Sequence, residues 1–180
     1  MLRPLALKDV PGMLEWMHDA EIQKSFRRPM GSYTRQDAER FILGSATVPA
    51  AGGCVNFAVA GEDDEYLGTI SLKNFDLEAR SAEYAVVLRS CAHGKHVGKR
   101  ASMELLKKGF KDFGLERIYL TVYPENVPAV RLYEKCGFVY EGTMRSSAYF
   151  EGRFRDQLLY AILREEYFAS QGEKTDGNNA

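Results

Sequence analysis

Residues 86–101 read VVLRSCAHGKHVGKRA, a strand followed by a basic turn with two glycines and then a helix. From Val97 to Phe113, small and apolar residues recur with the period of a helix that packs closely on a sheet. A helix N-terminus offers unpaired N–H groups and about half a positive charge, and glycine lets a phosphate approach the backbone. The turn therefore predicts a pyrophosphate site. A plain turn kept soluble by its lysines and arginine is the alternative that this stretch leaves open.

The elements on either side of this stretch predict a mixed α/β domain. Strands are expected at residues 2–7, 55–60, 66–75, 82–88, 117–123, 138–144 and 153–163, and further helices after Asp9, after Thr34 and at 126–136. Their order predicts a central sheet of about seven strands with helices on both faces. We expect one domain over residues 1–170 and a disordered tail over 171–180, which is rich in glycine, asparagine and charge.

The composition excludes several classes of protein. The chain has 180 residues, of which 45% are hydrophobic and 27% charged, and no apolar run approaches the length of a membrane span. Its formal charge of −1 gives no broad positive field for nucleic acid or for an anionic membrane. Three unclustered cysteines and an N-terminus without an apolar signal core predict a reduced, cytoplasmic location without disulfides.

A second motif lies thirty residues after the turn. Residues 126–138 read NVPAVRLYEKCGF, which fits the pattern N-x-x-A-x-x-L-Y-x-K-x-G-F. Asn126 and Tyr133 are seven residues apart, so two helical turns place them on one face. This motif resembles the helix that follows the fifth strand in the GNAT superfamily of acetyltransferases, and the resemblance extends from about Leu2 to Tyr167.

The resemblance implies a splayed sheet that binds acetyl-coenzyme A, with no metal. The turn corresponds to the family's loop Gln/Arg-x-x-Gly-x-Gly/Ala, with His93 and His96 standing where the family has Gln/Arg and the first glycine. If the His96 backbone needs a positive φ, it costs about 1 kcal/mol more than glycine. The cofactor residues implied are Val86, Val87, Leu88, His93, Gly94, Lys95, His96, Val97, Gly98, Lys99, Asn126, Ala129 and Tyr133.

The family's chemistry implies direct attack of a neutral primary amine on the thioester. Tyr133 is then the general acid that protonates the departing thiolate, and Glu83 is the candidate base or water-relay residue. An ordinary core tyrosine and a surface carboxylate are the alternatives for these two residues. With no strong base in the sequence, an α-amine or a sugar amine is favoured over a lysine-like amine, whose deprotonation at pH 7 costs about 4 to 5 kcal/mol.

The acceptor and the partners follow less directly. Glu141-Gly142-Thr143-Met144-Arg145 and Asp156 resemble the branch of ribosomal-protein N-terminal acetyltransferases, to which polyamine and amino-sugar acetyltransferases are related. We expect the loop Asp19–Gly31 to line the acceptor site, and a homodimer is expected from related enzymes. Two alternatives remain open at this point: a non-catalytic module that binds acetyl-coenzyme A, and a metal site at Cys91, His93 and His96, which lacks a fourth ligand.

Overall fold

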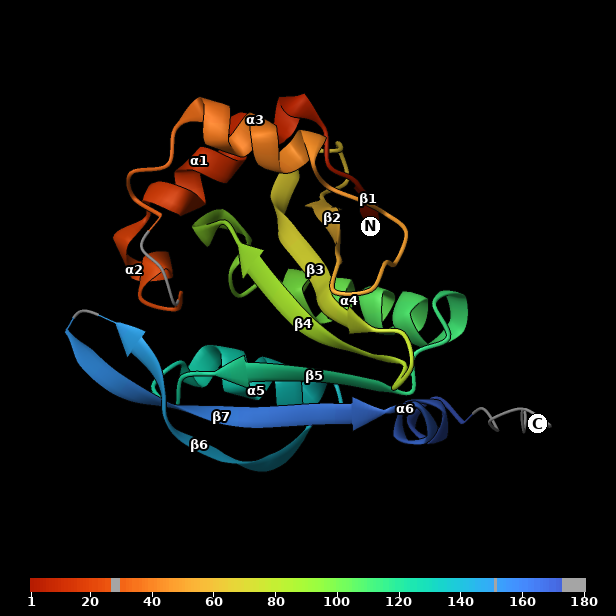
Figure 1. The fold of residues 1–180 in the computed structure, drawn as a ribbon. Helices are drawn as coiled ribbons and strands as arrows, with labels where there is room; N and C mark the ends of the chain where they lie inside the picture. Colours follow the sequence, from red (N-terminus) through yellow and green to blue (C-terminus); the bar gives the residue numbers. More distant parts are fainter. Residues whose placement is uncertain (27–29, 151, 173–180) are drawn as a thin grey trace.

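A computed structural model describes residues 1–26, 30–150 and 152–172. Seven strands form one sheet in the order β1-β2-β3-β4-β5-β7-β6, which confirms the predicted mixed α/β fold (Figure 1). The strands are β1 (Leu2–Pro4), β2 (Cys54–Ala60), β3 (Tyr66–Asp76), β4 (Ser81–Leu88), β5 (Arg117–Val122), β6 (Val139–Phe150) and β7 (Arg153–Leu163). The predicted meander is β2–β3–β4, all antiparallel, whereas β4 and β5 pair in parallel.

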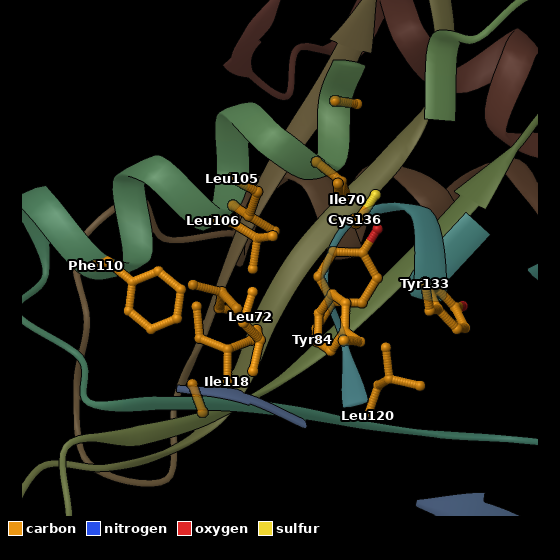
Figure 2. Packing of buried hydrophobic residues seen from close by; sticks show 14 of the residues in the cluster. Ile70, Leu72, Tyr84, Leu105, Leu106, Phe110, Ile118, Leu120, Tyr133 and Cys136 are labelled. Carbon is orange, nitrogen blue, oxygen red and sulfur yellow. The ribbon is translucent and has the colours of Figure 1, made fainter. Parts of the chain in front are cut away.

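Helices cover both faces of this sheet. They are α1 (Val10–His18), α2 (Ala20–Gln23), α3 (Arg35–Leu43), α4 (Val97–Lys107), α5 (Val127–Lys135) and α6 (Arg164–Ser170). The larger core lies on the face that α4 and α5 cover, where Tyr84 of β4 lies between Leu105 of α4 and Tyr133 of α5 (Figure 2). A second core on the opposite face joins α1 and α3 to β2 and β3. Successive residues of β2, Phe57 and Ala58, enter different cores, as the two-residue period of a strand requires.

Several element boundaries differ from the sequence prediction. The first strand was expected to reach residue 7, but β1 ends at Pro4 because the buried Asp9 carboxylate accepts hydrogen bonds from Arg3 (2.8 Å) and from the Ala6 N–H (2.9 Å) and folds the chain back. The helix expected up to residue 113 is α-helical to Lys107 and continues as a π-helical turn at Lys108–Asp112. The prediction missed α2 and α6 and ended β6 six residues early. Residues 173–180 of the expected tail lie outside the described residues.

The sheet divides between β4 and β5. These strands pair from Ser81–Glu83 against Arg117–Tyr119 and then separate. Beyond that point β4 stays paired with β3 as far as Leu88, and β5 stays paired with β7 as far as Val122. The two halves of the sheet therefore open like a V, as the resemblance implied, and the open end faces α2 (Figure 1).

Candidate active site

One wall of the gap is the edge of β4. From Tyr84 to Leu88 this strand has β3 on one side and no strand on the other. Because backbone groups in an antiparallel ladder point alternately to the two sides, every second residue here directs its N–H and C=O into the gap. The predicted cofactor residues Val86, Val87 and Leu88 lie in this segment. The edge can therefore pair with an extended ligand that carries amide groups.

The predicted pyrophosphate turn lies at the end of that strand. Gly94 and His96 both have positive φ, 73° and 59°. His96 therefore adopts the left-handed conformation considered from the sequence, which is uncommon for a residue other than glycine. No side chain caps α4, so no side chain satisfies the N–H groups of its first turn, and the preceding turn residues 93–96 are exposed. In the described part of the chain, Lys95 and Lys99 have no ion-pair partner. This combination of open N–H groups and free positive charge suits an anion.

Gly98 has a packing role in this helix. A Cβ at this position would lie 3.2 Å from Leu132 Cδ2 of α5 and 3.3 Å from Leu88 Cδ1 of β4. Gly98 is buried, whereas the neighbouring Lys99 is exposed. The glycine thus allows α4 to approach both neighbours closely, and the side chains that can reach a ligand from this turn are the exposed basic ones. Val97 is buried and anchors the helix in the main core.

The turn is also tied to the first half of the chain. Ser90 Oγ donates to Asp19 Oδ2 at 2.7 Å, and this hydrogen bond is the main reason why the pKa of Asp19 lies below its usual value. Asp19 also caps α2 by accepting from the N–H groups of Glu21 and Ile22. His93 Nε2 lies 3.3 Å from the Leu88 carbonyl oxygen, which holds the imidazole over the end of β4.

Tyr133 of α5 lies on the α4 side of the gap. Its ring is 8% exposed and packs edge-on against Tyr84 (5.7 Å between centroids) and against Phe138 (5.9 Å). Burial raises the pKa of Tyr133 above its usual value, so the phenol stays protonated at neutral pH. Among the described residues, none forms a hydrogen bond with its hydroxyl. An available, protonated hydroxyl is what a general acid requires.

Asn126 performs two structural tasks at the start of α5. Its Oδ1 accepts from the Ala129 N–H at 3.3 Å, the N-cap interaction that the sequence predicted. Its Nδ2 donates to Ser25 Oγ at 2.9 Å and so joins the segment after α2 to the helix that carries Tyr133. Together with the contact between Asp19 and Ser90, this hydrogen bond attaches the α2 segment to the chain on both sides of the gap.

Glu83 is not brought beside Tyr133. Tyr84 packs against Tyr133, so the preceding residue of the strand points to the opposite face. There the Glu83 carboxylate forms an ion pair with Lys73 at 2.9 Å and accepts from Asn74 Nδ2 at 2.7 Å. Glu83 also lies in the closed part of the β4–β5 pair, opposite Tyr119. Its role as a base stays a prediction.

Sequence reasoning missed a group of residues where β5 ends and β7 begins. Arg155 lies over the ring of Tyr123, with 3.7 Å between the guanidinium carbon and the ring centroid, and pairs with Glu125. These residues are about thirty positions apart in the chain, and no local pattern indicates their contact. Burial raises the pKa of the Cys136 thiol, which packs in the main core.

Across residues 1–26, 30–150 and 152–172, no three His, Cys, Asp or Glu side chains gather as a metal site needs. No helix in this part of the chain combines the length and the apolar character that crossing a bilayer requires.

Comparison with known proteins decides the family. A model of the acetyltransferase (GNAT) domain matches residues 1–139. The chain belongs to the GNAT acetyltransferase family. It is therefore an N-acetyltransferase that uses acetyl-coenzyme A, as the two motifs predicted.

Relatives within the GNAT family include enzymes named for a polyamine. A spermidine N(1)-acetyltransferase of Vibrio cholerae is 32% identical over 62% of this chain and 64% of its own length. The crystal structure of a spermidine N-acetyltransferase from Vibrio cholerae in complex with CoA and spermine has a TM-score of 0.81 and 25% identity, and the match covers 93% of this chain and 97% of that one. A putative ribosomal N-acetyltransferase of Bacillus subtilis is 30% identical over 62% of this chain and 60% of its own length.

Proposed function

We propose that this GNAT acetyltransferase transfers the acetyl group to the primary amine of a small molecule inside the gap between β4 and β5. The observation that carries the proposal is the position of Tyr133, whose ring packs against Tyr84 just beyond the last paired residue of β4 and β5 and whose hydroxyl has no hydrogen-bond partner in the described chain. The free edge of β4 would hold the pantetheine arm by backbone hydrogen bonds, and the uncapped start of α4 with Lys95 and Lys99 would hold the pyrophosphate.

The transfer requires that the departing sulfur gains a proton and that the attacking amine loses one. The neutral amine attacks the thioester carbon, a C–N bond forms, and the C–S bond breaks. Tyr133 would donate its proton to the departing sulfur, and the amine proton would pass to water or to Glu83. A backbone N–H on the open edge of β4 would stabilise the developing oxyanion. Because an α-amine loses only about 1 kcal/mol by deprotonation at pH 7, weakly basic acceptors need the least help from a base.

The acceptor class is proposed from the relatives and from the site together. Some relatives are named for a polyamine, so a small amine is proposed as the acceptor class, and an amino sugar and a protein N-terminus remain the other acceptors that the sequence predicted. The relationship to ribosomal enzymes rests on the partial Bacillus subtilis match. The α2 segment, fixed across the open end by Asp19 and Asn126, is proposed to form one wall of the acceptor site. The expected homodimer stays a prediction.

An acceptor screen tests the proposal. Release of coenzyme A from acetyl-coenzyme A is measured with polyamines, amino sugars, nucleotide-linked amino sugars, amino acids and peptides with free N-termini. We expect turnover with at least one small amine, and mass spectrometry should find the acetyl group on its nitrogen. Tight binding of acetyl-coenzyme A without acetylation of any amine would contradict the proposal and would favour the non-catalytic module.

A further inference from the structure

A pocket of about 340 Å³ lies next to the open end of the gap. It is lined by Pro124, Glu125, Arg153, Phe154, Arg155 and Asp156. These residues come from the turn between β5 and α5 and from the first residues of β7. In Figure 1 the same end of the molecule holds the end of β4 and the helix α2. The volume is at the lower end of the range for small-molecule sites, so it suits one part of a small acceptor.

Two buried polar groups beside the pocket lack partners. The Tyr123 hydroxyl belongs to a side chain that is 2% exposed, and the Arg155 Nε is also buried. Neither group forms a hydrogen bond with a described residue. A buried polar group without a partner costs about 1 to 3 kcal/mol. Burying both groups without partners therefore does not stabilise the fold. The arrangement indicates that Arg155 is positioned for a ligand.

The charged side chains that line the pocket differ in how many partners they have within the chain. Arg155 donates a hydrogen bond from Nη2 to Glu125, whereas no described residue accepts a hydrogen bond from its Nη1. Asp156 Oδ1 accepts from the Ser146 N–H at 2.8 Å. The pKa of Glu125 is lowered first by the hydrogen bond from its own N–H and then by Arg155 and Arg153, so this carboxylate is already well compensated. Arg153 is exposed and acts on Glu125 through its charge, but it forms no hydrogen bond or ion pair with a described residue.

The donors that remain free in this pocket are therefore cationic. They are the guanidinium of Arg153 and the Nε and Nη1 of Arg155. Guanidinium groups bind a carboxylate through parallel N–H···O bonds, which fix its orientation as well as its position. A polyamine carries ammonium groups along its whole length and would place like charges beside both arginines. The two carboxylates of the lining already have partners, because Glu125 pairs with Arg155 and Asp156 accepts from the Ser146 N–H, so an incoming carboxylate suits the remaining guanidinium donors better than a further cation does.

We propose that this pocket binds a carboxylate of the acceptor, so that the substrate is a small amine with a carboxylate, such as an amino acid or a short peptide. The inference rests on the proposed function, because it assumes that the pocket lies along the path of the acceptor to the thioester. It assigns Arg153 and Arg155 to specificity and leaves the acetyl transfer to the residues of the gap.

The test uses matched acceptors that differ in one charge. A dipeptide and its C-terminal amide are compared at about pH 9, above the α-amine pKa of about 7.8, with spermidine as the cationic reference. We expect kcat/KM for the acid to exceed that for the amide by roughly tenfold, the size of one hydrogen bond to a charged group. The Arg153→Gln variant should abolish most of this preference and leave the affinity for acetyl-coenzyme A unchanged. Arg145→Gln, which alters an exposed arginine of β6 outside the lining, should keep the preference.

A binding measurement separates this inference from the proposed function. Calorimetry with the coenzyme A complex should show tighter binding of the acid than of the amide in the native chain and in Arg145→Gln, and equal binding in Arg153→Gln. Preferential binding of the acid supports the pocket even if no amine is acetylated, in which case only the proposed function fails. Equal binding and equal turnover of acid and amide, or a preference for spermidine that Arg153→Gln leaves intact, would overturn the inference.

Discussion

The helices α4 and α5 begin at the same gap in the sheet, and they begin differently. The start of α4 has a left-handed histidine, His96, and no side-chain cap. The start of α5 has Asn126, whose side chain caps the helix and reaches across to Ser25, and Pro128 in its first turn. One helix leaves its N–H groups for a ligand, whereas the other satisfies one of them within the chain.

This difference assigns separate tasks to the two helices. An uncapped N-terminus with exposed lysines attracts an anion, so α4 is suited to the phosphates of the cofactor. A capped helix that is also tied to the α2 segment has a fixed position, so α5 is suited to hold the Tyr133 hydroxyl in one place. The variants below test this division, and they run from the largest expected effect to the smallest.

Removal of the Tyr133 hydroxyl should have the largest effect. Tyr133→Phe is expected to reduce kcat by about 10²-fold or more, the usual contribution of a general acid. The free energy of unfolding should change little, because the hydroxyl has no hydrogen-bond partner among the described residues. Steady-state kinetics and thermal denaturation measure the two quantities. Tyr84→Phe is the matched control, since it removes a hydroxyl that binds Ser102 Oγ at 2.6 Å and should reduce stability while sparing the rate.

The pH profile gives an independent measure of the same residue. Burial raises the pKa of Tyr133, so its acid form persists beyond the usual tyrosine value of about 10. The contribution of Tyr133 to the rate should therefore be constant through neutral pH and be lost only as the pH rises above that value. A rate that falls with a midpoint well below pH 10 in the native chain and not in Tyr133→Phe would contradict the assignment.

Reversal of charge at the start of α4 should weaken the binding of acetyl-coenzyme A. We expect the double variant Lys95→Glu/Lys99→Glu to raise the Kd for acetyl-coenzyme A by about tenfold or more, with a smaller dependence on salt than the native chain. These two side chains are exposed, so the fold should be unaffected, whereas Gly98→Asp would disturb the packing on Leu132 and confuse the result. Lys107→Glu, exposed at the other end of the same helix, is the control. Equal affinity for acetyl-coenzyme A in the native chain, the double variant and Lys107→Glu would show that the start of α4 does not bind the phosphates.

Loss of the α5 cap should have a moderate effect on stability. Asn126→Ala removes the cap and the hydrogen bond to Ser25, and the free energy of unfolding should fall by about 1 kcal/mol. Ser25→Ala removes the second interaction alone and should cost less. Denaturant titration of the two variants separates these contributions. If the two costs are equal, the cap contributes nothing and the division between the helices is wrong on the α5 side.

The smallest effect is expected at His96. Its φ of 59° is a conformation that glycine adopts without strain, so His96→Gly should raise the free energy of unfolding by at most about 1 kcal/mol. His96→Ala keeps the strain and should give no gain. Chemical denaturation can resolve the difference between the two variants. A clear loss of stability in His96→Gly would show that the imidazole makes a contribution larger than the backbone strain.

Sequence reasoning succeeded where an element is decided by neighbouring residues. The helix expected after Thr34 is α3, which begins with a capping box between Thr34 and Asp37, and Asn126 opens α5 as predicted. It failed for α2, because a helix of four residues is too short to show the helical period of apolar residues. It also shortened β6, because most side chains of this edge strand are exposed on both faces and the expected alternation is absent.

The candidate site divides in the same way. The strained backbone of His96 could be anticipated from its place in the turn, because the family has glycine there. The surroundings of Glu83 could not, since Lys73 and Asn74 reach it across the sheet. The stack of Arg155 on Tyr123 likewise joins residues that only the folded sheet brings together. Sequence patterns thus anticipated the backbone of the turn before α4 better than the side-chain contacts around Glu83 and Arg155.

The outer strand β6 has a consequence for how copies of this chain meet. It is twelve residues long and forms the edge of the sheet, where free backbone groups invite another strand to pair. Its register shifts between Tyr140 and Gly142 and again between Met144 and Ala148, and Ser146 has a φ of 51°. Irregularities of this kind twist an edge and interrupt its ladder. A neighbouring strand would therefore find only short regular stretches of β6 to pair with, which makes this edge a poor template for extending the sheet.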